Sequence, residues 1–140
     1  MKTLYTILVI AVLFSILSIN GCSGSKEQLT ITPLVGTEWK LETLNGKTVS
    51  LNSGNYITLN FSGAADKISG AGVCNKYFGE FTKTGDAMKF CGIGSTKMMC
   101  DDNLNESDYF NALVETDSYK ISGGKLSLIS KGVALAVFKQ

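Results

Sequence analysis

The sequence predicts a mainly β fold of the α+β class, in which about seven or eight antiparallel strands form a barrel-like sheet and one helix precedes the last three strands. Two observations support this prediction. The chain has 15 glycines but 1 proline, and its β-branched and aromatic residues fall in short runs between turn signals. Because so many strands leave exposed edges in a flat sheet, we expect the sheet to curl and the helix to plug or cover it.

The first strands are marked by alternation. Residues 36–44 alternate apolar and polar side chains, which is typical of a strand with one wet face. Asn45-Gly46 is a hairpin signal, because both residues tolerate positive φ, and residues 47–51 are expected to return as a partner strand. Residues 56–61 alternate most clearly.

A glycine-rich segment follows, over residues 68–81, and predicts one long, bent strand in which glycines allow bulges or close backbone approach. A turn centred on Thr84 and Gly85 then returns the chain along residues 87–93. This hairpin register is expected to place Cys74 across from about Ser95.

The helix is expected to begin near Asn105. Asn105 can cap it, and Glu106 and Asp108 place negative charge in the first turn. The apolar residues at helical spacing should pack on the sheet as one stripe: Tyr109, Phe110, Leu113 and Val114. After the helix, residues 119–121, 125–130 and 133–138 alternate again between glycine-containing turns and predict three antiparallel strands.

The N-terminus predicts export and lipid attachment. A lysine and the apolar stretch Leu4 to Ile19 make an export signal, somewhat short for a membrane-spanning helix. The following Ile-Asn-Gly-Cys resembles the lipobox of bacterial lipoproteins, which implies that Cys22 is cut free and acylated. The predicted organisation is a signal peptide at 1–21, lipidated Cys22 with a flexible tether over 22–32, and one domain over 33–140.

Lipidation would place the protein in the cell envelope, attached to a membrane through its lipid anchor. Each buried methylene of an acyl chain contributes about 0.8 kcal/mol, so more than one chain makes a stable anchor. Ser23 follows the cysteine, where enteric bacteria use aspartate for inner-membrane retention, and the outer membrane is therefore favoured. An ordinary secreted protein cleaved nearby is the alternative.

Composition excludes several classes of protein. There is no histidine, which removes the usual general base and the commonest metal ligand and excludes histidine-dependent serine and cysteine hydrolases. The 13 basic residues are all lysines and form no basic run, so a nucleic-acid partner is not expected. We predict no cofactor and no metal site, and a monomer.

One cysteine is assigned to lipid, and three remain. No Cys-x-x-Cys pair exists for zinc. We favour a disulfide between Cys74 and Cys100, which closes a loop of about 27 residues and would contribute about 3–4 kcal/mol to the free energy of unfolding. The alternative pairs Cys74 with Cys91, but the expected register puts Cys91 opposite Phe78 or Gly79. Cys91 is then the spare thiol.

Several stretches, taken in order, resemble one family. They are Leu34-Val-Gly-Thr-Glu-Trp39, the Gly-x-Gly-x-Cys-Asn-x-Tyr-x-Gly pattern of residues 70–79, Thr96-Lys-Met-Met-Cys100, the acidic helix, and the closing strands. Together they are similar to the META domain, the family of HslJ-like heat-inducible bacterial proteins. This chain has Val73 where the family commonly has glycine.

The resemblance implies a small β-rich fold with a helix, frequent occurrence as exported lipoproteins, and an association with heat or antibiotic stress and envelope maintenance. It brings no catalytic residues. We therefore expect a non-enzymatic, membrane-anchored module that binds an envelope protein or another envelope component. Asn75, Lys76, Tyr77 and Phe78 are the candidate interaction patch. The structural alternative is that Asn75 satisfies backbone groups at a bulge and an aromatic neighbour fills the core.

Two other functions stay open. An enzyme would use carboxylates, such as those of Asp101 and Asp102, or the spare thiol. A calcium module would use Asp101-x-Asn103-x-Asn105, which is similar to the start of an EF-hand loop. Glu106 stands where that loop needs glycine, and Ala112 where it needs a bidentate glutamate.

Overall fold

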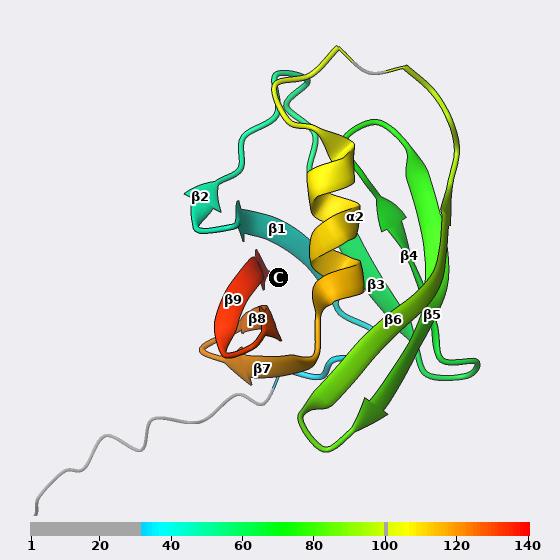
Figure 1. Cartoon of the computed structure of the whole chain (residues 1–140), viewed down its shortest axis with the longest axis vertical. Helices are drawn as coiled ribbons and strands as arrows, with labels where there is room; N and C mark the ends of the chain where they lie inside the picture. Colours follow the sequence, from blue (N-terminus) through cyan, green and yellow to red (C-terminus); the bar gives the residue numbers. More distant parts are fainter. Residues whose placement is uncertain (1–31, 100) are drawn as a thin grey trace, which may run out of the picture.

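The computed structural model describes residues 32–99 and 101–140. Predictions for the signal peptide, Cys22 and Cys100 lie outside these residues. Within them, nine antiparallel strands and one α-helix make up the fold (Figure 1). The strands are β1 (Glu38–Leu44), β2 (Lys47–Thr48), β3 (Thr58–Ser62), β4 (Lys67–Ala71), β5 (Lys76–Thr84), β6 (Ala87–Ser95), β7 (Ser118–Ser122), β8 (Lys125–Ser130) and β9 (Val133–Lys139), and the helix is α2 (Glu106–Glu115).

The sheet closes into a ring. Neighbouring strands follow the order β2-β1-β3-β4-β5-β6-β7-β8-β9, and β9 also pairs with β1, where Leu41 lies opposite Phe138. Inward-facing side chains of the strands meet α2 in one core, which includes Trp39, Tyr109 and Leu113. The predicted fold class is confirmed, since the helix precedes the last three strands.

The N-terminal strands follow the predicted alternation. Trp39 and Leu59 are fully buried, and the Trp39 indole N–H donates to the Leu34 carbonyl at 3.1 Å. Both residues of the Asn45-Gly46 turn have positive φ, as the hairpin requires. The returning strand β2 is shorter than the predicted 47–51, because the chain beyond it turns to bury Leu51 in the core.

The prediction of one long strand over residues 68–81 is wrong. This segment forms two strands, β4 and β5, which pair with each other so that Ser69 lies opposite Phe78. Residues 72–75 make the turn between them, closed by the Gly72 N–H donating to the Asn75 carbonyl at 2.6 Å. The glycines serve a chain reversal rather than a bend, which raises the strand number to nine.

The predicted register of the β5–β6 hairpin is also wrong. The turn residues are Gly85 and Asp86, one position further along the chain than predicted, and a bulge between Phe78 and Glu80 shifts the register again. Cys91 therefore lies opposite Glu80. A bulge inserts an extra residue that alternation alone does not show.

The helix begins as predicted. The Asn105 side chain accepts the Ser107 N–H at 3.0 Å and caps α2. The stripe differs at one position: Val114 is 62% exposed, and Ala112 is buried in its place. Figure 1 shows α2 lying against the ring beside β6, which it contacts along with β8 and β9. Within the described chain, this helix is too short and too polar to cross a membrane.

Candidate functional site

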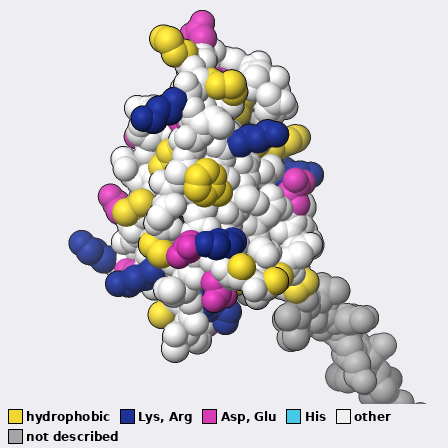
Figure 2. Space-filling model, turned by 90° about the vertical axis from the view of Figure 1, so that its right-hand side faces the viewer, with side chains coloured by type: hydrophobic (Ala, Val, Ile, Leu, Met, Phe, Trp, Pro, Cys, Tyr) yellow, Lys and Arg dark blue, Asp and Glu magenta, His cyan; other side chains and the backbone are white. Residues whose placement is uncertain are grey.

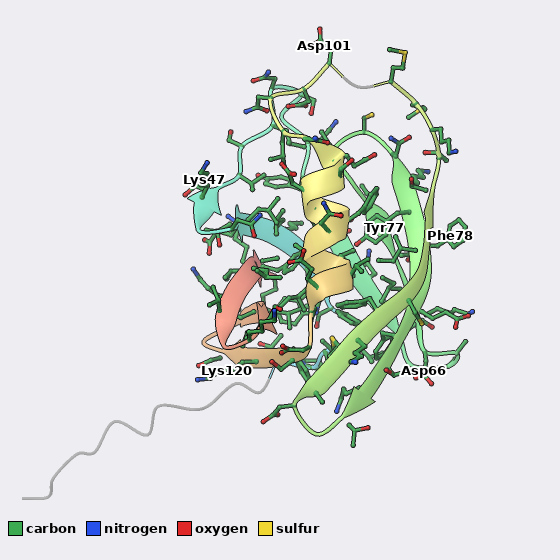
Figure 3. All side chains as sticks on the ribbon, viewed as in Figure 1. Lys47, Asp66, Tyr77, Phe78, Asp101 and Lys120 are labelled. Atoms are coloured by element: carbon green, nitrogen blue, oxygen red, sulfur yellow. The ribbon has the colours of Figure 1, made fainter. Side chains whose placement is uncertain are left out.

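The four residues of the predicted patch do not share one environment. Asn75 and Tyr77 are buried, whereas Lys76 and Phe78 are exposed. For Lys76, Tyr77 and Phe78 this division follows from strand geometry, since successive side chains of β5 point to opposite faces. Asn75 lies in the turn before β5. Figure 3 shows Tyr77 directed toward α2 and Phe78 directed away from it.

Asn75 joins three segments of the chain. Its Oδ1 accepts the Thr96 hydroxyl at 2.8 Å and the Met98 N–H at 2.7 Å. Its Nδ2 donates to the Met98 carbonyl at 3.3 Å and to Glu106 Oε2 at 2.6 Å. We call Asn75, Thr96, Met98 and Glu106 the Asn75 latch. A buried amide with its donors and acceptor paired stabilises the arrangement instead of costing free energy.

Glu106 connects the latch to the helix. Its Oε1 accepts the N–H groups of Cys74 and Asn75 at 3.3 and 3.0 Å. A Cβ added to Gly72 would lie 2.4 Å from the same oxygen, so a larger residue there would push the Glu106 carboxylate out of these hydrogen bonds. A carboxylate in the first turn of a helix is also favoured by the helix dipole. Glu106 is therefore committed to hydrogen bonds within the protein.

Two buried tyrosines form the polar centre of the core. The Tyr77 hydroxyl donates to the Thr58 carbonyl at 2.8 Å and lies 2.7 Å from the Tyr109 hydroxyl. Because each phenol has one hydrogen, Tyr109 donates to Tyr77. Burial raises the pKa of both phenols above the usual range, so both stay neutral and structural at physiological pH.

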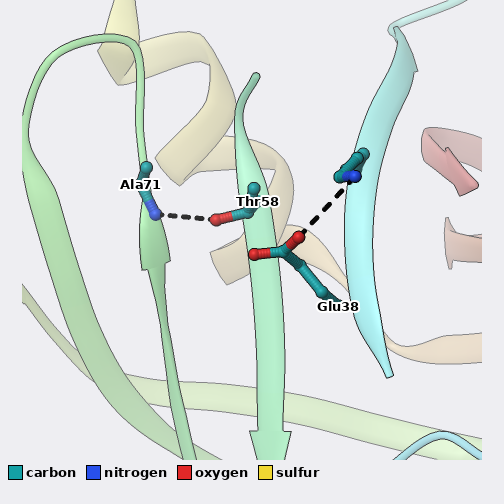
Figure 4. Close-up of polar contacts among 4 residues, drawn as sticks. Glu38, Thr58 and Ala71 are labelled. Atoms are coloured by element: carbon teal, nitrogen blue, oxygen red, sulfur yellow. Dashed lines mark hydrogen bonds and ion pairs between the residues drawn. The ribbon is translucent and has the colours of Figure 1, made fainter. Parts of the chain in front are cut away.

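A groove of about 370 Å³ opens on the outer side of β1, β3 and β4. It lies where the β3–β4 ladder ends, and there Thr58 Oγ1 accepts the Ala71 N–H at 3.0 Å (Figure 4). The Thr58 carbonyl accepts the Tyr77 hydroxyl instead of a ladder bond. The side chains that line it include Glu38, Lys40, Tyr56 and Lys76, and we call it the outer groove.

The outer groove combines an exposed ring with charges of both signs. Tyr56 is 56% exposed, and Lys40 Nζ lies 5.7 Å from its ring centroid, within reach of a cation–π contact. Lys40 also pairs with Glu38 at 3.7 Å. Sequence analysis missed this groove, because the alternation of residues 56–61 marked Tyr56 only as an outward position.

Phe78 is the exposed aromatic of β5. It is 64% exposed and covers Gly94 on β6, where an added Cβ would lie 2.9 Å from its ring. Lys76 and Glu80 point to the same side, and Glu80 forms an ion pair with Lys67. Figure 2 shows this side of the molecule, where exposed apolar side chains stand separately among charged ones.

The acidic segment before α2 holds a neighbouring loop. Asp102 accepts the Asn52 N–H at 3.0 Å, and Asn103 Nδ2 donates to the Ser50 carbonyl at 2.9 Å. The Asn52 N–H, followed by those of Asn103 and Ser53, holds the Asp102 pKa below its usual range. Of the residues predicted as calcium ligands, Asn103 thus holds the loop and Asn105 caps α2, whereas Asp101 is exposed. No cluster of metal-ligating side chains is found in the described ranges.

Cys74 and Cys91 lie in different surroundings. Cys74 is half-buried beside the latch, with its Sγ 3.8 Å from the Met98 carbonyl, two residues before Cys100. The predicted Cys74–Cys100 pairing involves a residue outside the described ones and stays a prediction. Cys91 is an exposed free thiol on the outer side of β6, facing Glu80.

A model of the META domain matches residues 32–140. No curated protein matches the sequence.

Two NMR structures resemble the fold. One, described only as that of a protein, is 26% identical, with a TM-score of 0.57, over 73% of this chain and 86% of the other. The second, of a protein from Burkholderia xenovorans, is 23% identical, with a TM-score of 0.58, over 76% of this chain and 82% of the other. The second likeness shows the fold alone.

Proposed function

The chain belongs to the META domain family, and we propose that it is a lipid-anchored, non-enzymatic binding module of the cell envelope. One observation supports the binding role above the others. The side chains best suited to chemistry, those of Asn75, Glu106, Tyr77 and Tyr109, hydrogen-bond inside the fold. The outer surface presents Tyr56 and Phe78 beside lysines instead.

The anchor part of the proposal rests on the sequence. The export signal over residues 1–21 and the lipobox-like residues before Cys22 support lipidation, with the outer membrane favoured. Cys22→Ser should move the protein from the membrane fraction to the soluble fraction and remove the fatty acyl mass from the mature N-terminal peptide. A wild-type N-terminal peptide without acyl chains would contradict the anchor.

The binding part centres on three neighbouring residues of the outer surface. Lys76 lines the outer groove and points to the same side of β5 as Phe78, so Tyr56, Lys76 and Phe78 form a surface with rings and positive charge. Tyrosine and phenylalanine are enriched in the centres of protein interfaces, where they bury much area at low entropic cost. We propose that this surface binds an envelope protein or another envelope component.

The test is photo-crosslinking in intact cells, before and after heat stress. A photoreactive residue at position 78 should give specific adducts. The same residue at position 133 is the matched control, because Val133 is 63% exposed on β9. Adducts should disappear when Tyr56→Ala and Lys76→Ala are added. Equal adducts from both positions, or none from position 78 in either condition, would refute the binding surface.

A further inference from the structure

The weakest junction of the ring lies between β6 and β7. These strands share one residue pair, Ala87 opposite Ser118, because β6 begins there and β7 continues past the hairpin turn. The Met88 N–H donates to the Asp117 carbonyl at 3.0 Å, and the Tyr119 N–H donates to the Asp86 carbonyl at 2.9 Å. Beyond these bonds, β7 runs on without β6.

Strand geometry then defines a free edge, meaning an edge that no described strand covers. The Tyr119 N–H points toward β6, so the N–H and carbonyl groups of Ile121, two residues on, point the same way. On its other side β7 is fully paired with β8, from Ser118 opposite Ile129 to Ser122 opposite Lys125. The Ile121 backbone groups therefore face away from the sheet at a position where a further strand would receive them.

A groove of about 700 Å³ runs along this edge. Its apolar part comes from the half-buried Tyr119, Ile121 and Ile129, and Asp86 lies at the end where β6 begins. Lys120 lies in the middle of the edge and is exposed (Figure 3). Its side chain points to the outer face, because it alternates with the inward-facing Tyr119 and Ile121.

Lys120 selects among possible occupants. Two copies of the chain pairing edge to edge about the middle of β7 would place their Lys120 side chains opposite each other, and like charges directly opposite destabilise strand pairing. Lysine on an edge strand is a common device against such self-association. A strand with a carboxylate at that position would be attracted instead.

We propose that the free edge of β7 binds an extended segment of another polypeptide, which adds a strand to the ring and places a carboxylate opposite Lys120. The backbone of the segment hydrogen-bonds to the N–H and carbonyl groups of Ile121. The residues on either side of its carboxylate are apolar, and they pack against the side chains of Tyr119 and Ile121. Main-chain bonds supply affinity and the alternating side chains supply specificity, as in other cases of strand addition. This site is separate from the outer groove and does not depend on the lipid anchor.

A synthetic peptide tests the proposal with the full-length protein purified in detergent. The peptide is fluorescein-labelled Ser-Thr-Val-Glu-Val-Thr-Ser, and fluorescence anisotropy measures its binding. Lys120→Glu should weaken binding about 3- to 10-fold, because an exposed attraction becomes a repulsion. The same variant should bind the peptide with lysine in place of glutamate more tightly than wild type does. Lys47→Glu on β2 changes the net charge equally and is the control.

Two further measurements test whether the peptide binds through its backbone. N-methylation of both valines removes the donors of the added strand and should abolish binding, and the unmodified peptide should slow hydrogen exchange of the Ile121 amide. The proposal is overturned if the N-methylated peptide binds equally, if Lys47→Glu and Lys120→Glu have equal effects, or if no peptide binds at millimolar concentration. It is also overturned if Lys120→Glu changes the oligomeric state, because the edge is then occupied by a second copy.

Discussion

The two ends of the β5–β6 hairpin are joined to the rest of the molecule in different ways. At the end far from the hairpin turn, the Asn75 latch ties β5 to the segment after β6 and to the first turn of α2 through side-chain hydrogen bonds. At the turn end, one residue pair and two flanking backbone bonds connect β6 to β7. The same hairpin is thus fastened at one end and open at the other.

The residues that stand out in the sequence are not the ones whose polar groups are left for binding. The glycine, cysteine and asparagine pattern of residues 70–79 attracts attention, yet most of its polar side chains are committed to the fold. The β7 edge has no unusual composition, but no described strand pairs with β7 at Ile121 on that side. Binding capacity is therefore expected on outer surfaces and at the open edge, and the following changes test this contrast.

The largest expected effect is that of Gly70→Ala at the fastened end. The new Cβ would lie 2.0 Å from the Thr58 carbonyl oxygen and 2.8 Å from the Tyr77 ring, so the backbone must move. Overpacking of this kind should lower the free energy of unfolding by about 3 kcal/mol. Urea denaturation measures it. Gly63→Ala is the control: its Cβ meets only the Val35 side chain, and a loss as large there would contradict the close-approach explanation.

Glu106→Ala should rank next. It leaves the N–H groups of Cys74 and Asn75 and the Asn75 amide without their acceptor, at a cost of about 2–3 kcal/mol in the free energy of unfolding. Asp108→Ala removes a carboxylate from the same helical turn and should cost only about 0.3–1 kcal/mol through the helix dipole. Equal losses for the two variants would show that charge, rather than the latch, explains the role of Glu106.

Removing the hydroxyl of Tyr77 should cost more stability than removing that of Tyr109. Tyr77→Phe leaves both the Thr58 carbonyl and the Tyr109 hydroxyl unpaired, and should cost about 2 kcal/mol. Tyr109→Phe leaves the Tyr77 donor in place and should cost about 1 kcal/mol. Thermal unfolding of the two variants measures the difference. A larger loss for Tyr109→Phe would reverse the assigned direction of the hydrogen bond.

The open end of the hairpin, where β6 meets β7, should lose more stability in acid than the fastened end. The Asp117 carboxylate accepts the Lys131 N–H at 2.7 Å and the Ser118 hydroxyl at 2.6 Å, and these bonds, the Lys131 N–H first, lower its pKa. A lowered pKa in the folded state gives stability that is complete above the unfolded value of about 3.9 and is lost as the pH falls through the folded value.

Asp117→Asn should therefore lose less stability than wild type between pH 5 and 2, because it has no carboxylate to protonate at this position. Urea midpoints measured across that range provide the comparison. Curves for the two proteins that stay parallel over the whole range would contradict a role for Asp117 in acid sensitivity. The effect should be the smallest of the four, because this carboxylate is only partly buried.

Local patterns predicted much of the fold and little of the site. Alternation identified β1 and β3, and Asn105 marked the start of α2, because strand faces and helix caps depend on near neighbours. The β4–β5 turn, the bulge beside Gly79 and the Asn75–Glu106 contact depend on residues brought together by the ring. Glu106 lies 31 positions from Asn75, and its own signal in the sequence is only that of a first-turn acid.

Amide hydrogen exchange on the native protein tests the contrast between the two ends most directly. The Asn75 amide, which donates to Glu106, should be among the slowest to exchange, and the Ile121 amide at the β7 edge should exchange at nearly the unprotected rate. Equal protection at the two positions would mean that the β7 edge is already covered. The account of one fastened end and one open end would then be contradicted.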